Sequence, residues 1–194
     1  QQQKVWSIER FIAQHRAALV ANDAARAAEL RALIRASGIA PSAGSIFPIA
    51  TALRSGAQCV VIDALAPPAP RMQACGANSA QWWCDARGAF HHTIQVDQCL
   101  TARGANELIS LADCDTDANS QRWQSIAINA SARVRYEPDS FSGQQTLDNF
   151  GASPGIYGIH GGPNQQWDDV ARDPFPLLAK LSASSIRLLR DLGF

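Results

Sequence analysis

The chain has 194 residues, of which 46% are hydrophobic and 18% charged, and its 17 basic residues balance 17 acidic residues. That composition is typical of a globular protein, but a net charge of zero offers no source for the electrostatic attraction on which binding to nucleic acids and anionic membranes depends. We therefore expect no nucleic-acid partner. Because no apolar run approaches the roughly 18 residues that span a bilayer, we also expect no membrane insertion.

Residues 4–37 are predicted to be helical, because apolar side chains recur there at helical spacing. This stripe consists of Val5, Ile8, Phe11, Ile12, Leu19, Leu30, Leu33 and Ile34. Asn22-Asp23 is expected to cap a second helix after a break, and Gly38 suits the left-handed position that ends it. Residues 39–57 are expected to form a connector, marked by Pro41, Ser42, Gly44 and Pro48.

Residues 57 to 170 have a different texture. Short runs rich in β-branched residues, such as 59–62, 93–96 and 132–136, are separated by Gly, Asn, Asp and Pro. Many short strands at close spacing predict a closed or sandwich-like all-β domain.

The last part of the chain is predicted to be helical again. Asp173 is expected to cap this helix, with Pro174 at its first position. Its apolar stripe consists of Leu178, Leu181, Leu188 and Leu192, with Ser185 inside it. Because neither terminal stripe should stay in water, we expect the two helical ends to pack together or onto the β domain.

A triplet of the form Gln-x-Trp occurs three times between these helical ends. The copies are Gln81-Trp82-Trp83, Gln121-Arg122-Trp123 and Gln165-Gln166-Trp167. Their closing tryptophans, Trp83, Trp123 and Trp167, recur at nearly equal intervals. Self-similarity at a fixed period of this size indicates a fold built from repeats.

The cysteines follow the same repeat. Cys59 precedes Trp83 by the same interval as Cys99 precedes Trp123, and Cys75 and Cys114 follow these two cysteines at nearly equal spacings. This match predicts Cys59–Cys75 and Cys99–Cys114 disulfides and an oxidising compartment, the alternative being four buried thiols in a cytosolic protein. The chain has no Cys-x-x-Cys pair, so no zinc site is expected. Cys84 is left over, either buried and inert or paired with another chain.

Three repeats of similar length that end in Gln-x-Trp resemble the ricin-type β-trefoil lectins over residues 57–170. The resemblance implies a mainly β fold, a β-trefoil of three repeats with four strands each, and the helical segments predicted above flank it. We predict that the chain is divided into a helical N-terminal segment (1–56), three repeats at about 57–90, 91–130 and 131–170, and a C-terminal helix (171–194). Each closing tryptophan is expected to enter a shared core, while each glutamine stays at the turn and satisfies backbone groups there. We recognise no family for the helical ends.

In this family a binding repeat has a carboxylate two residues after the first cysteine position. It also has an aromatic residue about ten residues before the tryptophan, and an asparagine directly before the glutamine. The three positions hold Val61, Gln73 and Ala80 in repeat one, Thr101, Ala112 and Ser120 in repeat two, and Asp148, Tyr157 and Asn164 in repeat three. The resemblance therefore implies one sugar site, in repeat three, with Gln165 beside it and His160 at its rim.

The chemistry of these residues suits a sugar. A carboxylate accepts hydrogen bonds from two adjacent hydroxyls, an amide both donates and accepts, and an aromatic ring offers an apolar face to a pyranose. The family implies galactose or N-acetylgalactosamine. Each residue also has a plainer interpretation: Asp148 caps a turn, Tyr157 packs on a β surface, and Asn164 follows Pro163 as a turn residue. Repeat three lacks both cysteines, with Thr146 and Ile159 in their places.

No catalytic residue, cofactor or metal site is predicted. The acidic residues Asp113, Asp115 and Asp117 lack the glycine and the distant glutamate of a calcium loop, so we expect a solvated turn. The neighbours His91 and His92 point to opposite faces of a strand and would rarely share a metal. Cys84 has these histidines downstream, but Trp82 and Trp83 beside it favour burial.

We therefore predict a non-enzymatic lectin module that is secreted, or periplasmic or at a cell surface, and that carries a toxin, hydrolase or surface assembly to galactose-type glycans. The alternative is a degenerate trefoil that binds a protein partner, or itself, through its helical ends. The sequence starts with Gln1 rather than Met, so we expect either a processed or a trimmed chain. The sequon Asn129-Ala130-Ser131 matters only in a eukaryotic secretory host.

Overall fold

The computed structural model describes residues 2–39, 45–62, 68–128, 132–173 and 176–194. Pro41, Ser42 and Gly44 of the predicted connector, the sequon at 129–131 and Pro174 lie outside these ranges. None of the helices in the described ranges is long and apolar enough to cross a membrane.

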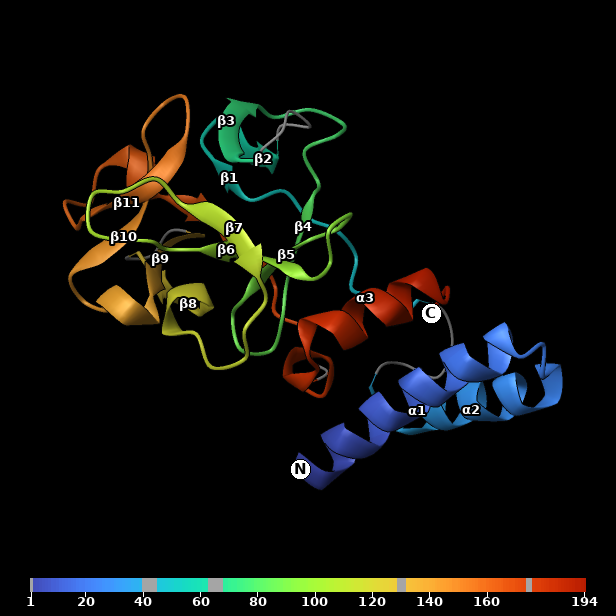
Figure 1. Cartoon of the computed structure of the whole chain (residues 1–194). Coiled ribbons are helices and arrows are strands. Elements are labelled where there is room, and N and C mark those ends of the chain that lie inside the picture. The colour runs from blue at the N-terminus through green and yellow to red at the C-terminus, as the bar shows by residue number, and fades with distance from the viewer. Residues whose placement is uncertain (1, 40–44, 63–67, 129–131, 174–175) are drawn as a thin grey trace.

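Two helices form an antiparallel pair at one end of the molecule (Figure 1). Helix α1 (Gln2–Val20) and helix α2 (Ala24–Ala36) are separated by the predicted break, where Asp23 caps α2 by accepting a hydrogen bond of 3.0 Å from the backbone N–H of Arg26. Gly38 follows α2 with φ +78°, a left-handed conformation that glycine adopts without steric cost. Two residues of the predicted apolar stripe, Leu19 and Leu33, are exposed and do not belong to the buried face of the helices.

Twelve strands lie in the described ranges, and they fall into three successive groups of four. Their bounds are β1 (Arg54–Ser55), β2 (Gln58–Ile62), β3 (Pro70–Ala74), β4 (Trp82–Cys84), β5 (Phe90–His92), β6 (Gln98–Thr101), β7 (Ser110–Asp113), β8 (Trp123–Ala127), β9 (Arg133–Pro138), β10 (Gln145–Asn149), β11 (Pro154–Gly158) and β12 (Trp167–Asp168). In each group the second and third strands form an antiparallel hairpin, β2–β3, β6–β7 and β10–β11. The fourth strand pairs with the first strand of the next group, as β4–β5 and β8–β9 do.

Each group also repeats one buried hydrogen bond. The indole N–H of Trp82, Trp123 and Trp167 donates to the carbonyl of Val60, Leu100 and Leu147, at 2.7, 3.1 and 3.0 Å. The three indoles and the three aliphatic side chains lie in one core cluster. Three equivalent four-strand units that share a core define a β-trefoil, so the predicted fold class is confirmed. The domain boundaries at 57 and 170 remain a prediction.

The first repeat has a different register from the one that the triplets predicted. Trp82, not Trp83, occupies the place of Trp123 and Trp167, since adjacent residues of a strand point to opposite faces. Trp83 packs in a second cluster, with the helices. Cys59 therefore lies one position closer to its core tryptophan than Cys99 does, Ala80 stands at the glutamine position, and Ser79 replaces Ala80 at the asparagine position.

The second cluster joins the helical ends to the trefoil, as predicted. Its main members are Ile8, Ile12, Ile34, Trp83, Val96, Leu178, Leu181, Ile186 and Leu189. Helix α3 (Ala183–Asp191) lies between the α1–α2 pair and the strands (Figure 1). Polar contacts fix it there, because Glu9 of α1 accepts hydrogen bonds from the backbone N–H of Ser182 at 2.8 Å and from the hydroxyl of Ser185 at 3.2 Å.

The predicted start of the C-terminal helix at Asp173 is wrong. The backbone N–H of Asp173 donates to the carbonyl of Cys84 at 2.7 Å, which holds this residue against β4. A 3-10 turn, η4 (Leu178–Lys180), follows, and the α-helix starts only after Ser182, whose hydroxyl accepts the N–H of Ser185 at 3.3 Å. Serine is a preferred N-cap residue, so Ser182 provided a signal that sequence analysis missed.

Candidate functional site

The predicted site residues of repeat three come together beside the β10–β11 hairpin. A cavity of about 300 Å³ is lined by Asp148, Asn149, Phe150, Tyr157, His160 and Asn164. Asp148 lies on β10 opposite Gly155, and Tyr157 lies on β11 opposite Thr146. The 3-10 turn η3 (Pro163–Gln165) supplies the two amide side chains. Sequence analysis missed Asn149 and Phe150, although an aromatic residue directly after the strand of Asp148 is a usable signal.

Asp148 is buried and its carboxylate accepts from three side chains. Oδ1 accepts from the Asn164 amide at 2.6 Å, and Oδ2 accepts from the Gln165 amide at 2.8 Å. His160 Nε2 lies 3.3 Å from the same Oδ2. Buried carboxylates need such partners, so these residues fix the position of Asp148. The plainer interpretation of Asp148 as a turn cap is wrong, because Asp148 lies inside a strand.

His160 covers the exposed side of this carboxylate. Its side chain is 42% exposed, whereas that of Asp148 is 1% exposed. The backbone N–H of Gly162 donates to His160 Nδ1 at 3.0 Å, so Nε2 carries the ring proton and donates to Asp148. His160 therefore lies at the rim of the cavity, and its contact with Asp148 is the longest of the three.

Gln165 holds the turn against the hairpin. Its Oε1 accepts from the backbone N–H groups of His160 and Gly161, at 3.0 and 3.1 Å. Its Nε2 donates to the carbonyl of Gly158 at 2.9 Å as well as to Asp148. The predicted role of the glutamine in satisfying backbone groups is thus present in repeat three, and the same side chain also positions the carboxylate.

Two aromatic rings form the apolar side of the cavity. Tyr157 is 47% exposed and Phe150 is 42% exposed, and their rings meet edge to face with centroids 6.1 Å apart. Tyr157 also lies 6.0 Å from the His160 ring. A Cβ at Gly155 would approach the Phe150 ring to 2.3 Å, so this glycine makes room for Phe150. Both rings are therefore partly exposed at the cavity, as well as packed against each other.

The equivalent places in the other repeats have different chemistry. In repeat two, Gln121 donates to the hydroxyl of Thr101 at 3.0 Å and to the carbonyl of Asp113 at 2.9 Å, and it accepts from the N–H of Asp115 at 2.8 Å. In repeat one, the position of Asp148 is held by Val61. Neither repeat presents a carboxylate at this position.

The cysteines pair as predicted. Cys59–Cys75 and Cys99–Cys114 are disulfides, so the alternative of four buried thiols is set aside. Cys84 is buried and free, and burial, followed by the negative charge of Asp85, raises its pKa to about 12. Such a thiol stays protonated at neutral pH and is not a nucleophile.

The acidic segment forms a turn, and the two histidines lie in a strand, as predicted. Asp115 Oδ1 accepts from the N–H of Asp117 at 2.8 Å, which closes a turn. His91 stacks on Trp83 and His92 contacts Trp82 edge to face, so the two rings point to opposite faces. Burial, and then the nearby charge of Arg190, lowers the pKa of His92 to about 4.

No family model and no curated protein matches the sequence. Solved structures do resemble it. The designed threefold-symmetric protein ThreeFoil shares 14% identity over 59% of this chain and 91% of its own, with a TM-score of 0.48. The C-terminal half of an earthworm R-type lectin, solved with GalNAc, shares 18% identity over 62% and 96% of the two chains, with a TM-score of 0.45. A chain of the Haemophilus ducreyi cytolethal distending toxin shares 12% identity over 70% and 98%, with a TM-score of 0.48.

Proposed function

We propose that repeat three binds a galactose-type sugar, galactose or N-acetylgalactosamine, at the cavity beside β10 and β11. The observation that carries this proposal is the position of Asp148, a buried carboxylate that Asn164 and Gln165 hold in place next to the exposed ring of Tyr157. Of the three repeats, repeat three alone has a carboxylate, an amide and an aromatic ring at these equivalent positions.

The hydrogen-bond capacity of Asp148 leaves room for a sugar hydroxyl. A carboxylate accepts about four hydrogen bonds, and three donors occupy it here. Because the His160 contact is the longest and comes from a half-exposed side chain, a sugar hydroxyl displaces it most easily. A neighbouring hydroxyl then binds between Asp148 and the amide of Asn164, and the C–H face of the ring lies on Tyr157.

We infer that the module is secreted, periplasmic or displayed at a cell surface, since two disulfides persist in an oxidising compartment. A single shallow site gives a Kd on the order of 0.1 to 1 mM. Affinity of that order becomes useful through several copies, so the module carries a larger toxin, hydrolase or surface assembly to glycans. In this arrangement residues 57–170 bind, and residues 1–56 and 171–194 connect the module to its assembly.

A second candidate is a protein-interaction module that uses its helical ends. The observation that favours it is the exposure of Trp6 and Val20 on α1, at 61% and 78%. The opposite, apolar face of α1 is already packed against α3 and the trefoil, so only this outer face is available. Trp6→Ala tests it by light scattering after size exclusion, because self-association through α1 would be weakened by this change.

The sugar site is tested by titrating galactose and N-acetylgalactosamine against the tryptophan fluorescence, with glucose as the control sugar. We expect saturable binding to the first two sugars and none to glucose. Asp148→Ala should weaken binding at least tenfold. Because that change leaves the half-buried Asn164 amide without its acceptor, Tyr157→Ala provides a second variant at an exposed position, with Ile94→Ala as its matched control.

Tyr157→Ala should weaken binding about tenfold and leave the unfolding midpoint unchanged, while Ile94→Ala changes neither. Equal affinity of the wild-type chain and both site variants would contradict the proposal, as would saturable binding of glucose.

A further inference from the structure

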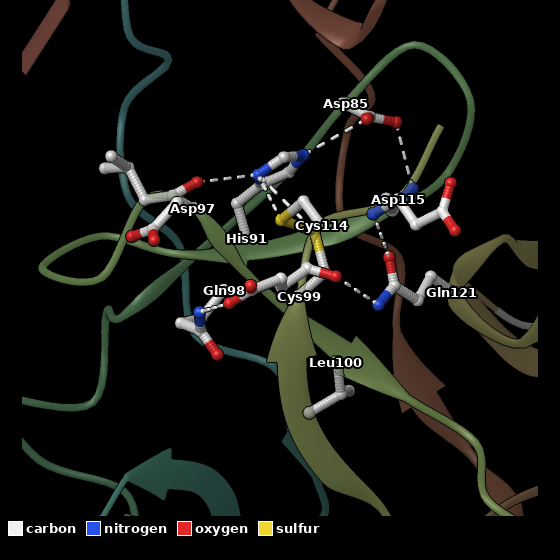
Figure 2. The surroundings of a disulfide bond; sticks show 12 residues. Asp85, His91, Asp97, Gln98, Cys99, Leu100, Cys114, Asp115 and Gln121 are labelled. Atoms are coloured by element: carbon white, nitrogen blue, oxygen red, sulfur yellow. Dashed lines mark hydrogen bonds and ion pairs between the residues drawn. A yellow bond between two sulfur atoms is a disulfide. The ribbon is translucent and has the colours of Figure 1, made fainter. Parts of the chain in front are cut away.

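A histidine ring lies directly against the second disulfide (Figure 2). His91 Nδ1, on β5, is 3.3 Å from Cys114 Sγ and 3.5 Å from Cys99 Sγ. All three side chains are buried. Within the described part of the chain, these residues form the one group of three whose ligand atoms all lie close enough together to hold a metal ion.

The ring of His91 is fixed with Nδ1 toward the two sulfurs and toward the carbonyl oxygen of Val96, which is nearer, at 3.0 Å. Its Nε2 lies 3.1 Å from Asp85 Oδ2, and Trp83 stacks on the ring at 3.9 Å and 7°. Asp85 is itself fixed, because its Oδ1 accepts from the backbone N–H groups of Arg87 and Ala89 at 2.8 and 2.9 Å. A carboxylate that holds one ring nitrogen, so that the other faces the ligand set, is the usual support of a metal-binding histidine.

The distances match those of a metal site. Tetrahedral zinc, with bonds of about 2.0 Å to nitrogen and 2.3 Å to sulfur, places the nitrogen about 3.6 Å from each sulfur. The observed distances of 3.3 and 3.5 Å need little adjustment. The two thiolates of such a site are about 3.8 Å apart. The Cα atoms of Cys99 and Cys114 are 5.0 Å apart, so rotation of the side chains can supply this separation once the disulfide is open.

We propose that the reduced form of this chain binds one zinc-type cation through His91 Nδ1, Cys99 Sγ and Cys114 Sγ, with a water in the fourth position. The second repeat would then have two alternative cross-links for the β6–β7 hairpin, a disulfide under oxidising conditions and a metal under reducing conditions. The proposal is independent of the sugar site, which lies in repeat three.

The chemistry balances with a dithiol as the reductant. Two-electron exchange breaks the S–S bond, gives Cys99 and Cys114 one proton each, and converts the dithiol to its own disulfide. In the oxidised chain both nitrogens of His91 face acceptors, because Nδ1 lies 3.0 Å from the carbonyl of Val96 and Nε2 faces Asp85. Zinc-type cations bind thiolates and a neutral imidazole, so binding of one divalent cation releases the two thiol protons and requires Nδ1 to be unprotonated.

A cavity lies near this group, although none of the three ligand residues lines it. It has a volume of about 640 Å³ and lies between α1, α3 and the β6–β7 hairpin, with Asp97, Asp113 and Ala183 in its lining. Ala183 packs against the small cluster that contains the two cysteines, and Cys114 is the more exposed of the two. The lining also contains Arg16, Arg187 and Asp191, and Arg187 pairs with Asp97, so the cavity is of mixed charge.

The first disulfide provides a matched control inside the same chain. Cys59 and Cys75 bridge the equivalent hairpin of repeat one, but in the described ranges they belong to no group with a histidine or a carboxylate at metal-binding distance. The proposal therefore predicts that cation binding follows Cys99 and Cys114 and is indifferent to Cys59 and Cys75.

The test uses the whole chain, reduced with a phosphine under nitrogen, separated from the reductant and titrated with Co²⁺. We expect one Co²⁺ per chain, with the visible absorption of tetrahedral cobalt and a thiolate-to-cobalt charge-transfer band, both removed by Zn²⁺. The oxidised chain should show neither. Cys59→Ser with Cys75→Ser should keep the spectrum, and Cys99→Ser with Cys114→Ser should lose it.

Two further variants keep all the cysteines. His91→Gln places an amide near Asp85 and removes the Nδ1 ligand, and it should weaken Co²⁺ binding more than tenfold. Asp85→Asn should weaken it about tenfold, since loss of such a support costs between 10-fold and 100-fold in affinity. The proposal is overturned if the reduced wild-type chain gives no tetrahedral cobalt spectrum, folded or not, or if His91→Gln binds Co²⁺ as well as the wild-type chain does.

Discussion

Repeats two and three use the same glutamine in the same way and differ in what it holds. Gln121 bridges its turn to the hydroxyl of Thr101, and Gln165 bridges its turn to the carboxylate of Asp148. Each glutamine also donates to a hairpin carbonyl and accepts from backbone N–H groups of the turn. The glutamine is thus part of the scaffold in both repeats, and the acceptor that it holds differs, a hydroxyl in repeat two and a carboxylate in repeat three.

The hairpins of the two repeats are also held by different bonds. Cys99–Cys114 closes the β6–β7 hairpin. In repeat three Thr146 stands at the first cysteine position, and its buried hydroxyl donates to the carbonyl of Tyr136 at 2.8 Å. Repeat three therefore has a hydrogen bond where repeat two has a covalent bond.

The largest effect is expected from the cross-links. Replacement of Cys99 and Cys114 by alanine should lower the free energy of unfolding by about 3 kcal/mol, the value for a loop of this length. Thr146→Val, at the equivalent place of repeat three, should cost about 1 kcal/mol. Denaturant unfolding of both variants measures the difference. Equal losses would show that the two hairpins depend on their closing bonds to the same extent.

An acid-sensitive contribution is expected from repeat two. His92 is neutral when folded, with its Nδ1 accepting from the N–H of Gln95 at 3.1 Å, and its pKa is lowered to about 4. The unfolded chain takes up this proton near pH 6.5, so stability is complete above that pH and falls as the pH decreases toward 4. We expect a loss on the order of 1 to 2 kcal/mol over this interval.

His92→Asn retains an acceptor for Gln95 without titrating in this interval. Unfolding measured at pH 7 and pH 4 should therefore show a smaller difference for this variant than for the wild-type chain. If the difference in stability between pH 7 and pH 4 is the same for the variant and the wild-type chain, His92 is not its source.

Removal of His160 should improve sugar binding. The ring donates to Asp148 at 3.3 Å and must leave before a hydroxyl can take its place. If that hydrogen bond contributes about 1 kcal/mol, His160→Ala should raise the affinity about fivefold. The same titration with N-acetylgalactosamine measures it. Weaker binding by the variant would mean that His160 contacts the sugar rather than covering its site.

The smallest effect is expected from a carboxylate placed in repeat two. Thr101→Asp gives Gln121 the same kind of partner that Gln165 has, but Ala112 and Ser120 still provide neither ring nor amide. The stoichiometry of sugar binding, measured calorimetrically, should remain one per chain. A second site in this variant would show that the carboxylate alone is sufficient.

Much of this arrangement was predictable from local patterns. The disulfides agreed with the nearly equal separations of the two cysteine pairs, 16 and 15 residues, although the match to the tryptophans used Trp83, which is not the core tryptophan of repeat one. The grouping of Asp148, Tyr157 and Asn164 followed from the resemblance to the ricin-type lectins. The role of Trp83 was mispredicted, because two adjacent tryptophans follow Gln81 and the sequence pattern alone does not distinguish which of them enters the trefoil core. What decides between them is the face of β4 that meets the trefoil core, which depends on tertiary packing.

The group around His91 was beyond prediction for a related reason. Asp85, His91 and the second disulfide come from separate strands and loops, and only the β5–β6 pairing brings His91 opposite Cys99. Phe150 was missed because its ring reaches the site across Gly155, a contact between strands.

The side-chain amide signals of Gln165 and Gln121 in a nitrogen-15 NMR spectrum test the central claim most directly. The account predicts that N-acetylgalactosamine, added until the signals stop moving, shifts the Gln165 amide and leaves the Gln121 amide in place, and that Asp148→Ala abolishes the shift. Movement of Gln121 with Gln165 unchanged, or no shift of either at sugar concentrations far above the expected Kd, would contradict it.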